Sequence, residues 1–207
     1  MCGRFHLQPD EDFYPRFGIK HKDDDYHLSP NTNISPGQRI ATIISGKKGI
    51  TLTPMKWGFI PVWATDERIG YKMINARAET VADKPSFKNA FKTSRCLIPA
   101  TGFYEWETRG KEKTPHLFQP EKVKYFAIAG LYSIWTSPDK KQIPTCTLIT
   151  TEADRVVGKY HNRMPVILDR NDEDKWLSVD DPDFLEDLVR TPVNFSLRDS
   201  KVKPNEM

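Results

Sequence analysis

The order of the strand-like segments limits the folds open to this chain. Residues with high β-propensity gather in runs at 40–45, 50–53, 95–99, 102–108, 124–135 and 143–151. Helical patterns at 84–93, 152–160, 172–177 and 183–190, and a short helix followed by a loop within 10–25, are inserted among these runs and do not alternate with single strands. This order is typical of an α+β domain with inserted helices on a mostly antiparallel, barrel-like sheet.

Length and charge set further limits. A chain of 207 residues with 38% hydrophobic residues suits one compact domain, expected over 1–198, with a polar, flexible tail at 199–207. The net charge of +3 permits a nucleic-acid partner without requiring one. No apolar run approaches the roughly 20 residues of a membrane span, and the start lacks a signal peptide. We therefore expect a cytoplasmic monomer with no membrane partner.

The three cysteines, Cys2, Cys96 and Cys146, are odd in number and widely spaced. This argues against a disulfide framework. The absence of a CxxC motif, and of histidines at zinc-ligand spacing, predicts no metal site and no cofactor. Cys96 and Cys146 lie in apolar strand-like runs and are expected to be buried.

Cys2 offers chemistry that no other position has. If Met1 is removed, Cys2 carries a free α-amine and a thiol on adjacent carbons. The amine can form an imine with an aldehyde, and the sulfur can then add to the same carbon, closing a thiazolidine ring. Ordinary pKa values of about 7.7–8.0 for the amine and about 8.5 for the thiol leave a fraction of each reactive near neutral pH.

Two further residues are candidates for proton transfer. Glu105 lies in an aromatic strand with Phe103, Tyr104 and Trp106, where desolvation would raise its pKa and suit it to acid–base work. The alternative is an exposed strand glutamate. His161 follows the expected helix at 152–160 and can donate a hydrogen bond or move a proton. The alternative is a structural histidine.

A third group of residues suits nucleic acid. Asn75 supplies both a donor and an acceptor, and the guanidinium of Arg77 matches phosphate, although a turn asparagine beside a solvated charge is also possible. Trp63, after Pro61, is a candidate for exposure. An exposed ring among cations could stack on the bases of a single strand.

Five blocks taken together resemble the SOS-response-associated peptidase (SRAP) family. They are Met1-Cys2-Gly3-Arg4-Phe5, Trp57-Gly58-x-x-Pro61-x-Trp63, Asn75-Ala76-Arg77-x-Glu79-Thr80, Gly102-Phe103-Tyr104-Glu105-Trp106 and His161-x-Arg163-Met164-Pro165. Each block is weakly specific, but five in family order over roughly residues 1–170, with the N-terminal cysteine, are strongly specific.

The resemblance implies a single SRAP domain that captures abasic sites in single-stranded DNA as a covalent crosslink and shields them. It implies that Cys2 is the nucleophile, that Asn75 positions the reacting groups, and that Glu105 and His161 handle protons. It also implies DNA lyase and N-terminal autopeptidase activities. The DNA-contacting residues that it implies are Arg4, Asn33, Pro36, Trp63, Arg77, Thr150 and Arg163. One departure is Ala64 after Trp63, where some relatives have a second tryptophan, so the base-stacking wedge is expected to be weaker.

Two other classes stay open from the residues alone. A cysteine peptidase using Cys2, His161 and Glu105 would turn over peptides in trans, or would act only in self-removal of Met1. A non-catalytic single-stranded DNA-binding module would bind intact DNA tightly and form no covalent product.

Overall fold

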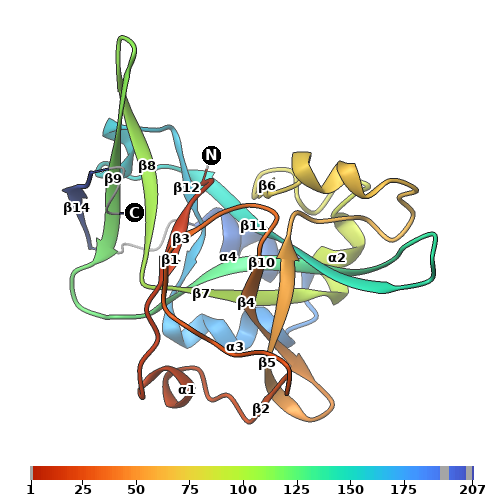
Figure 1. The fold of residues 1–207 in the computed structure, drawn as a ribbon. Coiled ribbons are helices and arrows are strands. Elements are labelled where there is room, and N and C mark those ends of the chain that lie inside the picture. Colours follow the sequence, from red (N-terminus) through yellow and green to blue (C-terminus); the bar gives the residue numbers. More distant parts are fainter. Residues whose placement is uncertain (1, 192–195, 204–206) are drawn as a thin grey trace.

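The computed structural model describes residues 2–191, 196–203 and 207. Its centre is a closed five-stranded barrel (Figure 1). The barrel strands are β4 (Arg39–Gly46), β5 (Gly49–Trp57), β7 (Arg95–Ala100), β10 (Phe126–Thr136) and β11 (Gln142–Glu152). Neighbours in the order β5-β4-β7-β10-β11 are antiparallel, and a parallel pairing of β11 with β5 at Thr145↔Lys56 and Cys146↔Trp57 closes the circle. The single α+β domain with a mostly antiparallel, barrel-like sheet is thus confirmed.

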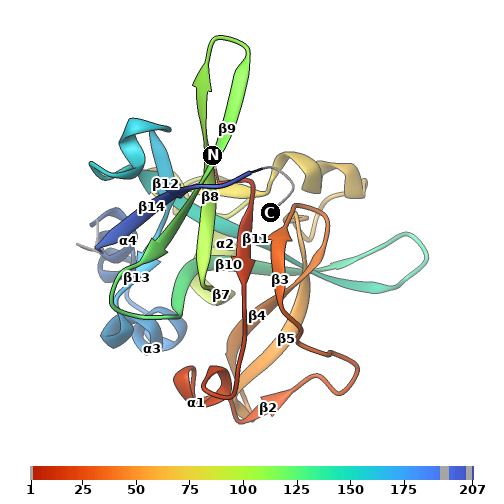
Figure 2. The same cartoon turned by 60° about the vertical axis from the view of Figure 1, so that its left-hand side comes forward.

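A second sheet carries the start of the chain. Its strands, in spatial order, are β14 (Leu197–Lys201), β9 (Glu112–Pro120), β8 (Gly102–Arg109), β1 (Phe5–Leu7) and β3 (Asn31–Ile34). The β8–β9 hairpin projects from the body, and β1 lies beside the base of β8 (Figures 1 and 2). This pairing brings the N-terminal segment next to the strand that holds Glu105.

Short strands extend both ends of the barrel wall. They are β2 (His21–Lys22) on β5, β6 (Asn75–Arg77) and β12 (Arg163–Pro165) on β11, and β13 (Ile167–Leu168) on β10. One strand, β11, therefore holds both the Asn75 segment and the segment that follows His161.

The helices cover the barrel. They are α1 (Phe13–Arg16), α2 (Lys88–Thr93), α3 (Arg170–Ser178) and α4 (Pro182–Arg190), with 3-10 turns η1 (Glu67–Lys72) and η2 (Val157–Lys159). Helix α3 packs on β4, β7 and β10, where buried Trp176 donates its Nε1 hydrogen to the Cys96 carbonyl at 3.0 Å. Within the described residues, none of the helices has the length and apolar character needed to cross a membrane.

Aromatic side chains join the two sheets. Phe5 on β1 meets Trp57 on β5 edge-on, with ring centroids 5.3 Å apart, and both are 1% exposed. Burying side chains of this size stabilises the fold by roughly 1.5–3 kcal/mol each. Cys96 and Cys146 are buried in the barrel wall as expected.

Two expectations differ from the structure. The helix at 152–160 is wrong: Glu152 stays in β11 opposite Arg163, and Asp154 Oδ1 accepts the backbone N–H groups of Val156 and Val157, so only the short turn η2 forms. The loose tail from Asp199 is wrong for 199–201, because β14 pairs with β9 there. Residues 204–206 of that tail lie outside the described residues.

Candidate active site

Cys2 is held at the start of β1. The β1–β8 register, with Phe5 opposite Phe103 and the Tyr104 N–H on the Arg4 carbonyl at 2.9 Å, runs the preceding residues alongside Glu105. Cys2 is fully buried, and its carbonyl accepts a hydrogen bond from Asn75 Nδ2 at 2.9 Å. The backbone of Cys2 is therefore fixed between β8 and β6. Met1 lies outside the described residues.

The amide of Asn75 faces Cys2 in a defined orientation. Because the Cys2 carbonyl can only accept, the NH₂ group must point towards it. The Oδ1 atom of Asn75 is buried and has no hydrogen-bond partner among the described residues. A buried acceptor without a partner carries a desolvation cost, so this oxygen is suited to receive a donor from a bound molecule.

Two contacts hold the Asn75 strand in place. Trp57 Nε1 donates to the Ile74 carbonyl at 2.8 Å, and Leu148 of β11 donates its N–H to the same carbonyl at 3.2 Å. The η1 segment packs closely because Gly58 and Gly70 meet backbone to backbone: a Cβ on Gly70 would lie 2.8 Å from the Gly58 oxygen. The Trp57-Gly58 block therefore supports the Asn75 strand by packing and hydrogen bonding.

Glu105 is a buried carboxyl. It lies in β8 at 3% exposure, and burial raises the pKa of its carboxyl to about 7. This fits the expected desolvated carboxylate rather than an exposed strand glutamate. A carboxyl with this pKa can accept and return protons near neutral pH.

The Cys2 thiol differs from the sequence expectation. Burial, and then the negative charge of Glu105, raise the pKa of the thiol well above its usual range. Cys2 therefore holds a protonated thiol near neutral pH, where the sequence analysis expected a reactive fraction. Because the thiolate is the nucleophile, the sulfur depends on a base to remove its proton.

The tautomer of His161 follows from its neighbours. The Arg163 N–H donates to His161 Nδ1 at 2.9 Å, so Nδ1 is the acceptor and the neutral ring carries its hydrogen on Nε2. Burial lowers the pKa of His161, which favours this neutral form. The half-buried ring thus presents an N–H donor at Nε2.

His161 lines a groove with two of the predicted DNA-contacting residues. The groove has a volume of about 560 Å³, and Arg77, His161 and Arg163 form part of its wall. Arg77 is exposed and lies two positions from Asn75 in β6, so β6 carries one residue of the Cys2 cluster and one residue of the groove. The wall also contains Glu152, and the exposed Arg77 is the cation in it that is suited to a phosphate.

Arg163 is already held by protein groups. Its guanidinium makes two hydrogen bonds to Glu79, at 2.5 and 3.0 Å, and a further one to the Thr150 carbonyl. Thr150 is 1% exposed and its Oγ1 donates to the Ala76 carbonyl at 3.4 Å. Arg163 Nη2 also lies 3.4 Å from Thr150 Oγ1, so buried Thr150 supports Arg163 through its carbonyl and its hydroxyl and is not part of the groove lining.

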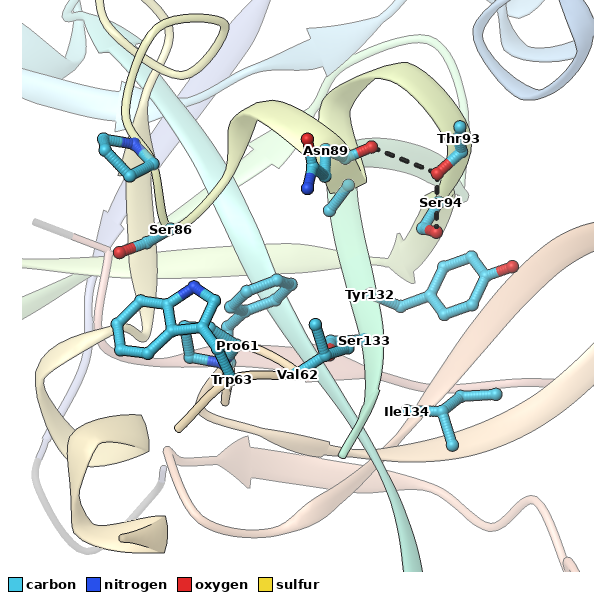
Figure 3. Close-up of a pocket in the computed structure, with 13 residues that line it drawn as sticks. Pro61, Val62, Trp63, Ser86, Asn89, Thr93, Ser94, Tyr132, Ser133 and Ile134 are labelled. Atoms are coloured by element: carbon cyan, nitrogen blue, oxygen red, sulfur yellow. Dashed lines mark hydrogen bonds between the residues drawn. The ribbon is translucent and has the colours of Figure 1, made fainter. Parts of the chain in front are cut away.

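The other predicted DNA-contacting residues are not part of the lining of this groove. Arg4 Nη1 donates to Asn33 Oδ1 at 2.5 Å, which ties β1 to β3, and Pro36 follows β3 and is half-buried. Trp63 is 59% exposed but lines a different pocket of about 340 Å³, with Pro61 and the exposed Val62 (Figure 3). None of the other predicted site residues lines that pocket.

Sequence reasoning assigned no role to Glu79. Its carboxylate pairs with Arg163, and this contact lowers the pKa of Glu79. The sequence signal that could have indicated this ion pair is that Glu79 belongs to the Asn75 block and the oppositely charged Arg163 belongs to the His161 block. Among residues 2–191, 196–203 and 207, no cluster of three or more His, Cys, Asp or Glu side chains has the arrangement of a metal site.

Comparisons with known proteins identify the family of this chain. A family model described as SOS response associated peptidase (SRAP) matches residues 1–205. Over 196 residues the chain is 43% identical to abasic site processing protein YoqW of Bacillus subtilis strain 168, covering 92% of this chain and 87% of that protein. It is 33% identical over 150 residues to abasic site processing protein HMCES of Gallus gallus, covering 61% of this chain and 45% of that protein.

Solved structures show the same fold. A crystal structure of a protein from Bacteroides thetaiotaomicron superposes with a TM-score of 0.89 at 24% identity, covering 99% of this chain and 93% of the other. One from Bordetella bronchiseptica has a TM-score of 0.84 at 24% identity, covering 98% and 100%. With a family model matched along almost its whole length, the chain belongs to the SOS response-associated peptidase family.

Proposed function

We propose that this protein processes abasic sites in single-stranded DNA by forming a covalent thiazolidine crosslink through Cys2 after Met1 is removed, which shields the lesion. The observation that carries the proposal is the convergence of Cys2, Asn75 and Glu105, with the Asn75 amide on the Cys2 carbonyl. The bacterial and vertebrate relatives are named abasic site processing proteins, which supports abasic sites as the substrate.

The first step joins the α-amine to the sugar. The ring-opened abasic sugar presents an aldehyde, and the Cys2 nitrogen attacks its carbon. Loss of one water then gives the imine. Asn75 fixes the Cys2 backbone, and its unpartnered Oδ1 can accept from the amine or a sugar hydroxyl. Such orientation can be worth effective molarities of about 10⁵ M or more.

The second step closes the ring. The sulfur adds to the imine carbon while its proton leaves and the imine nitrogen gains one, so no oxidant or reductant is needed. Because the thiol is held protonated by its surroundings, Glu105, with a pKa of about 7, is the group that would remove the proton and return it to nitrogen. Acid–base assistance of this kind contributes roughly 10²–10⁴-fold.

His161 and the groove handle the rest of the strand. The Nε2–H of His161 can donate to the sugar ring oxygen, favouring the open aldehyde, or to the adjacent phosphate. Arg77 would hold phosphate by its exposed guanidinium, whereas Arg163 would do so only while sharing or leaving Glu79. DNA binding should therefore weaken as salt rises.

The imine has a second fate. β-Elimination from it would cut the strand, so lyase activity competes with ring closure by sulfur. Self-removal of Met1 belongs to the same proposal, because the amine must be freed first. A peptidase that acts on peptides in trans is less well supported, because none of the five sequence blocks indicates a peptide-binding cleft. We propose a cytoplasmic monomer that has single-stranded DNA as its partner.

The test is intact mass spectrometry of the protein mixed with a single-stranded oligonucleotide that carries one abasic site. We expect a Met1-free protein that gains the oligonucleotide mass minus one water, and no adduct with an intact-base oligonucleotide. Borohydride should reduce an imine and leave a thiazolidine unchanged, so an adduct that gains no hydrogen indicates ring closure.

A Cys96→Ala variant is the matched control, because Cys96 is a buried thiol in the barrel wall. It should form the same adduct as the wild type. A Met1-free protein that stays unmodified would remove the crosslinking proposal and favour the DNA-binding module.

A further inference from the structure

We propose that Tyr160 and Asp199 are positioning residues for His161: the C-terminal strand β14 holds, through one side-chain hydrogen bond, the turn that carries His161 to the groove. The inference rests on the proposed function, since it concerns the rate of the same reaction. It gives β14, which the sequence analysis expected to be partly loose, a part in the site.

Asp154 Oδ1 caps the start of the turn before His161, and a second side-chain hydrogen bond joins the end of that turn to β14. Tyr160 Oη donates to Asp199 Oδ2 at 2.6 Å, joining positions 39 residues apart. The N–H groups of Tyr160 and His161 both donate to the Val157 carbonyl, at 2.9 and 3.0 Å. The two residues are thus consecutive parts of one turn, and restraining the Tyr160 ring restrains the backbone that aims His161.

The ring of Tyr160 also lies on β9. It packs on His116 with ring centroids 4.2 Å apart and meets Phe118 edge-on at 5.6 Å. His116 is the cross-strand neighbour of Glu105 in the β8–β9 hairpin. The same strand therefore supports Glu105 directly and His161 through Tyr160.

Asp199 is kept in place by backbone pairing and charge. It lies opposite Phe118 in the β14–β9 ladder, and its Oδ2 is 3.4 Å from His116 Nδ1. The hydrogen bond from Tyr160 lowers the pKa of Asp199, and the same contact raises the pKa of Tyr160 to about 12. The pair thus remains a phenol donor and a carboxylate acceptor across the neutral range.

The experiment compares Tyr160→Phe with the same substitution at a second tyrosine–aspartate hydrogen bond, which lies away from the site. Tyr160→Phe keeps the ring on His116 and Phe118 and removes only the donor. The control is Tyr125→Phe, because Tyr125 Oη also donates to an aspartate, Asp10, at 2.6 Å, beside α1 and away from His161. Single-turnover crosslinking to an abasic oligonucleotide gives the maximal rate and the half-saturating DNA concentration for each protein.

We expect Tyr160→Phe to lower the maximal rate by about 10- to 100-fold, the size of a misplaced catalytic group, with an unchanged half-saturating concentration. The pH–rate profile adds a readout that lost stability would not move. Without the Tyr160 hydroxyl, His161 should be more solvated, and its pKa should rise towards the ordinary value of about 6.5. The limb of the profile that belongs to His161 is the one that His161→Gln removes, and the midpoint of that limb should move to higher pH. Tyr125→Phe should match the wild type in both.

The outcomes separate the two proposals. If the wild type forms no adduct, the proposed function fails and this inference fails with it. If the wild type reacts and Tyr160→Phe matches Tyr125→Phe in rate and pH profile, only the positioning role is overturned. Asp199→Asn, which keeps an acceptor oxygen, should restore most of the rate lost in Asp199→Ala. Equal rates for these two variants would also overturn the inference, even if Tyr160→Phe does not fold.

Discussion

Replacing Glu105 with glutamine should make the protein more stable at alkaline pH while it slows the reaction. Burial raises the pKa of the Glu105 carboxyl from 4.5 to about 7. In the unfolded chain the carboxyl regains its ordinary value. Between about pH 4.5 and pH 7 the folded protein keeps a proton on Glu105 that the unfolded chain has released. The free energy of unfolding therefore falls as the pH rises from the unfolded pKa to the folded pKa.

The size of this effect follows from the pKa difference. Each pKa unit is worth about 1.4 kcal/mol, so the wild type loses about 3 kcal/mol of stability by about pH 8 and less than about 1 kcal/mol by about pH 5. Glutamine has nearly the same shape and does not ionise. Glu105→Gln should therefore be about 2–3 kcal/mol more stable than the wild type at about pH 8, with a melting temperature about 4–10 °C higher.

Urea unfolding of both proteins at the two pH values measures this difference. Glu112→Gln, in the exposed part of β9, is a control that should change stability equally little at both. Crosslinking by Glu105→Gln should be roughly 10²–10⁴-fold slower with DNA affinity near normal. If Glu105→Gln differs from the wild type in stability by the same amount at both pH values, the claim that burial raises the pKa of Glu105 is refuted. If DNA binding is lost in this variant, Glu105 is a structural residue.

Three further variants test the site. Cys2→Ala keeps the α-amine but cannot close the ring, so it should give an adduct that needs borohydride to persist and more strand cutting; an equally permanent adduct without reductant would contradict the thiazolidine. Trp57→Phe removes the 2.8 Å hydrogen bond to the Ile74 carbonyl, so it should lower the free energy of unfolding in urea by roughly 1–3 kcal/mol and slow crosslinking. Unaltered crosslinking kinetics would show that Trp57 does not support the site. Arg77→Ala should lower the slope of log affinity against log salt by about one in a binding titration, and an unaltered slope would argue against a phosphate contact.

The barrel could be predicted because its strands are long and apolar. The runs at 40–45, 95–99 and 143–151 all lie within observed strands. Strand β9 was missed because it is polar near the hairpin tip and contains Pro115 and Pro120, which weaken a strand pattern. Its absence from the prediction also hid the pairing of His116 with Glu105.

The site could be predicted only in part. Cys2, Asn75 and Glu105 were nominated by residue chemistry and family resemblance, and the fold brings them together. The unionised thiol could not be foreseen, because its pKa depends on burial by segments far away in the sequence. The buried contact of Thr150 with Arg163 was also hidden, since the strand pattern of 143–151 does not show which neighbouring strand covers Thr150.

Strand β11 carries a consequence for how the protein folds. It pairs with β10, β5, β6 and β12, so barrel closure and the placement of Asn75 depend on one strand. The β5 and β6 pairings join segments distant in sequence, and contacts of this kind form late because chain entropy opposes them. Chains caught midway through folding would therefore hold Cys2 without its partners, and adduct formation should appear only with the last, slowest phase of refolding.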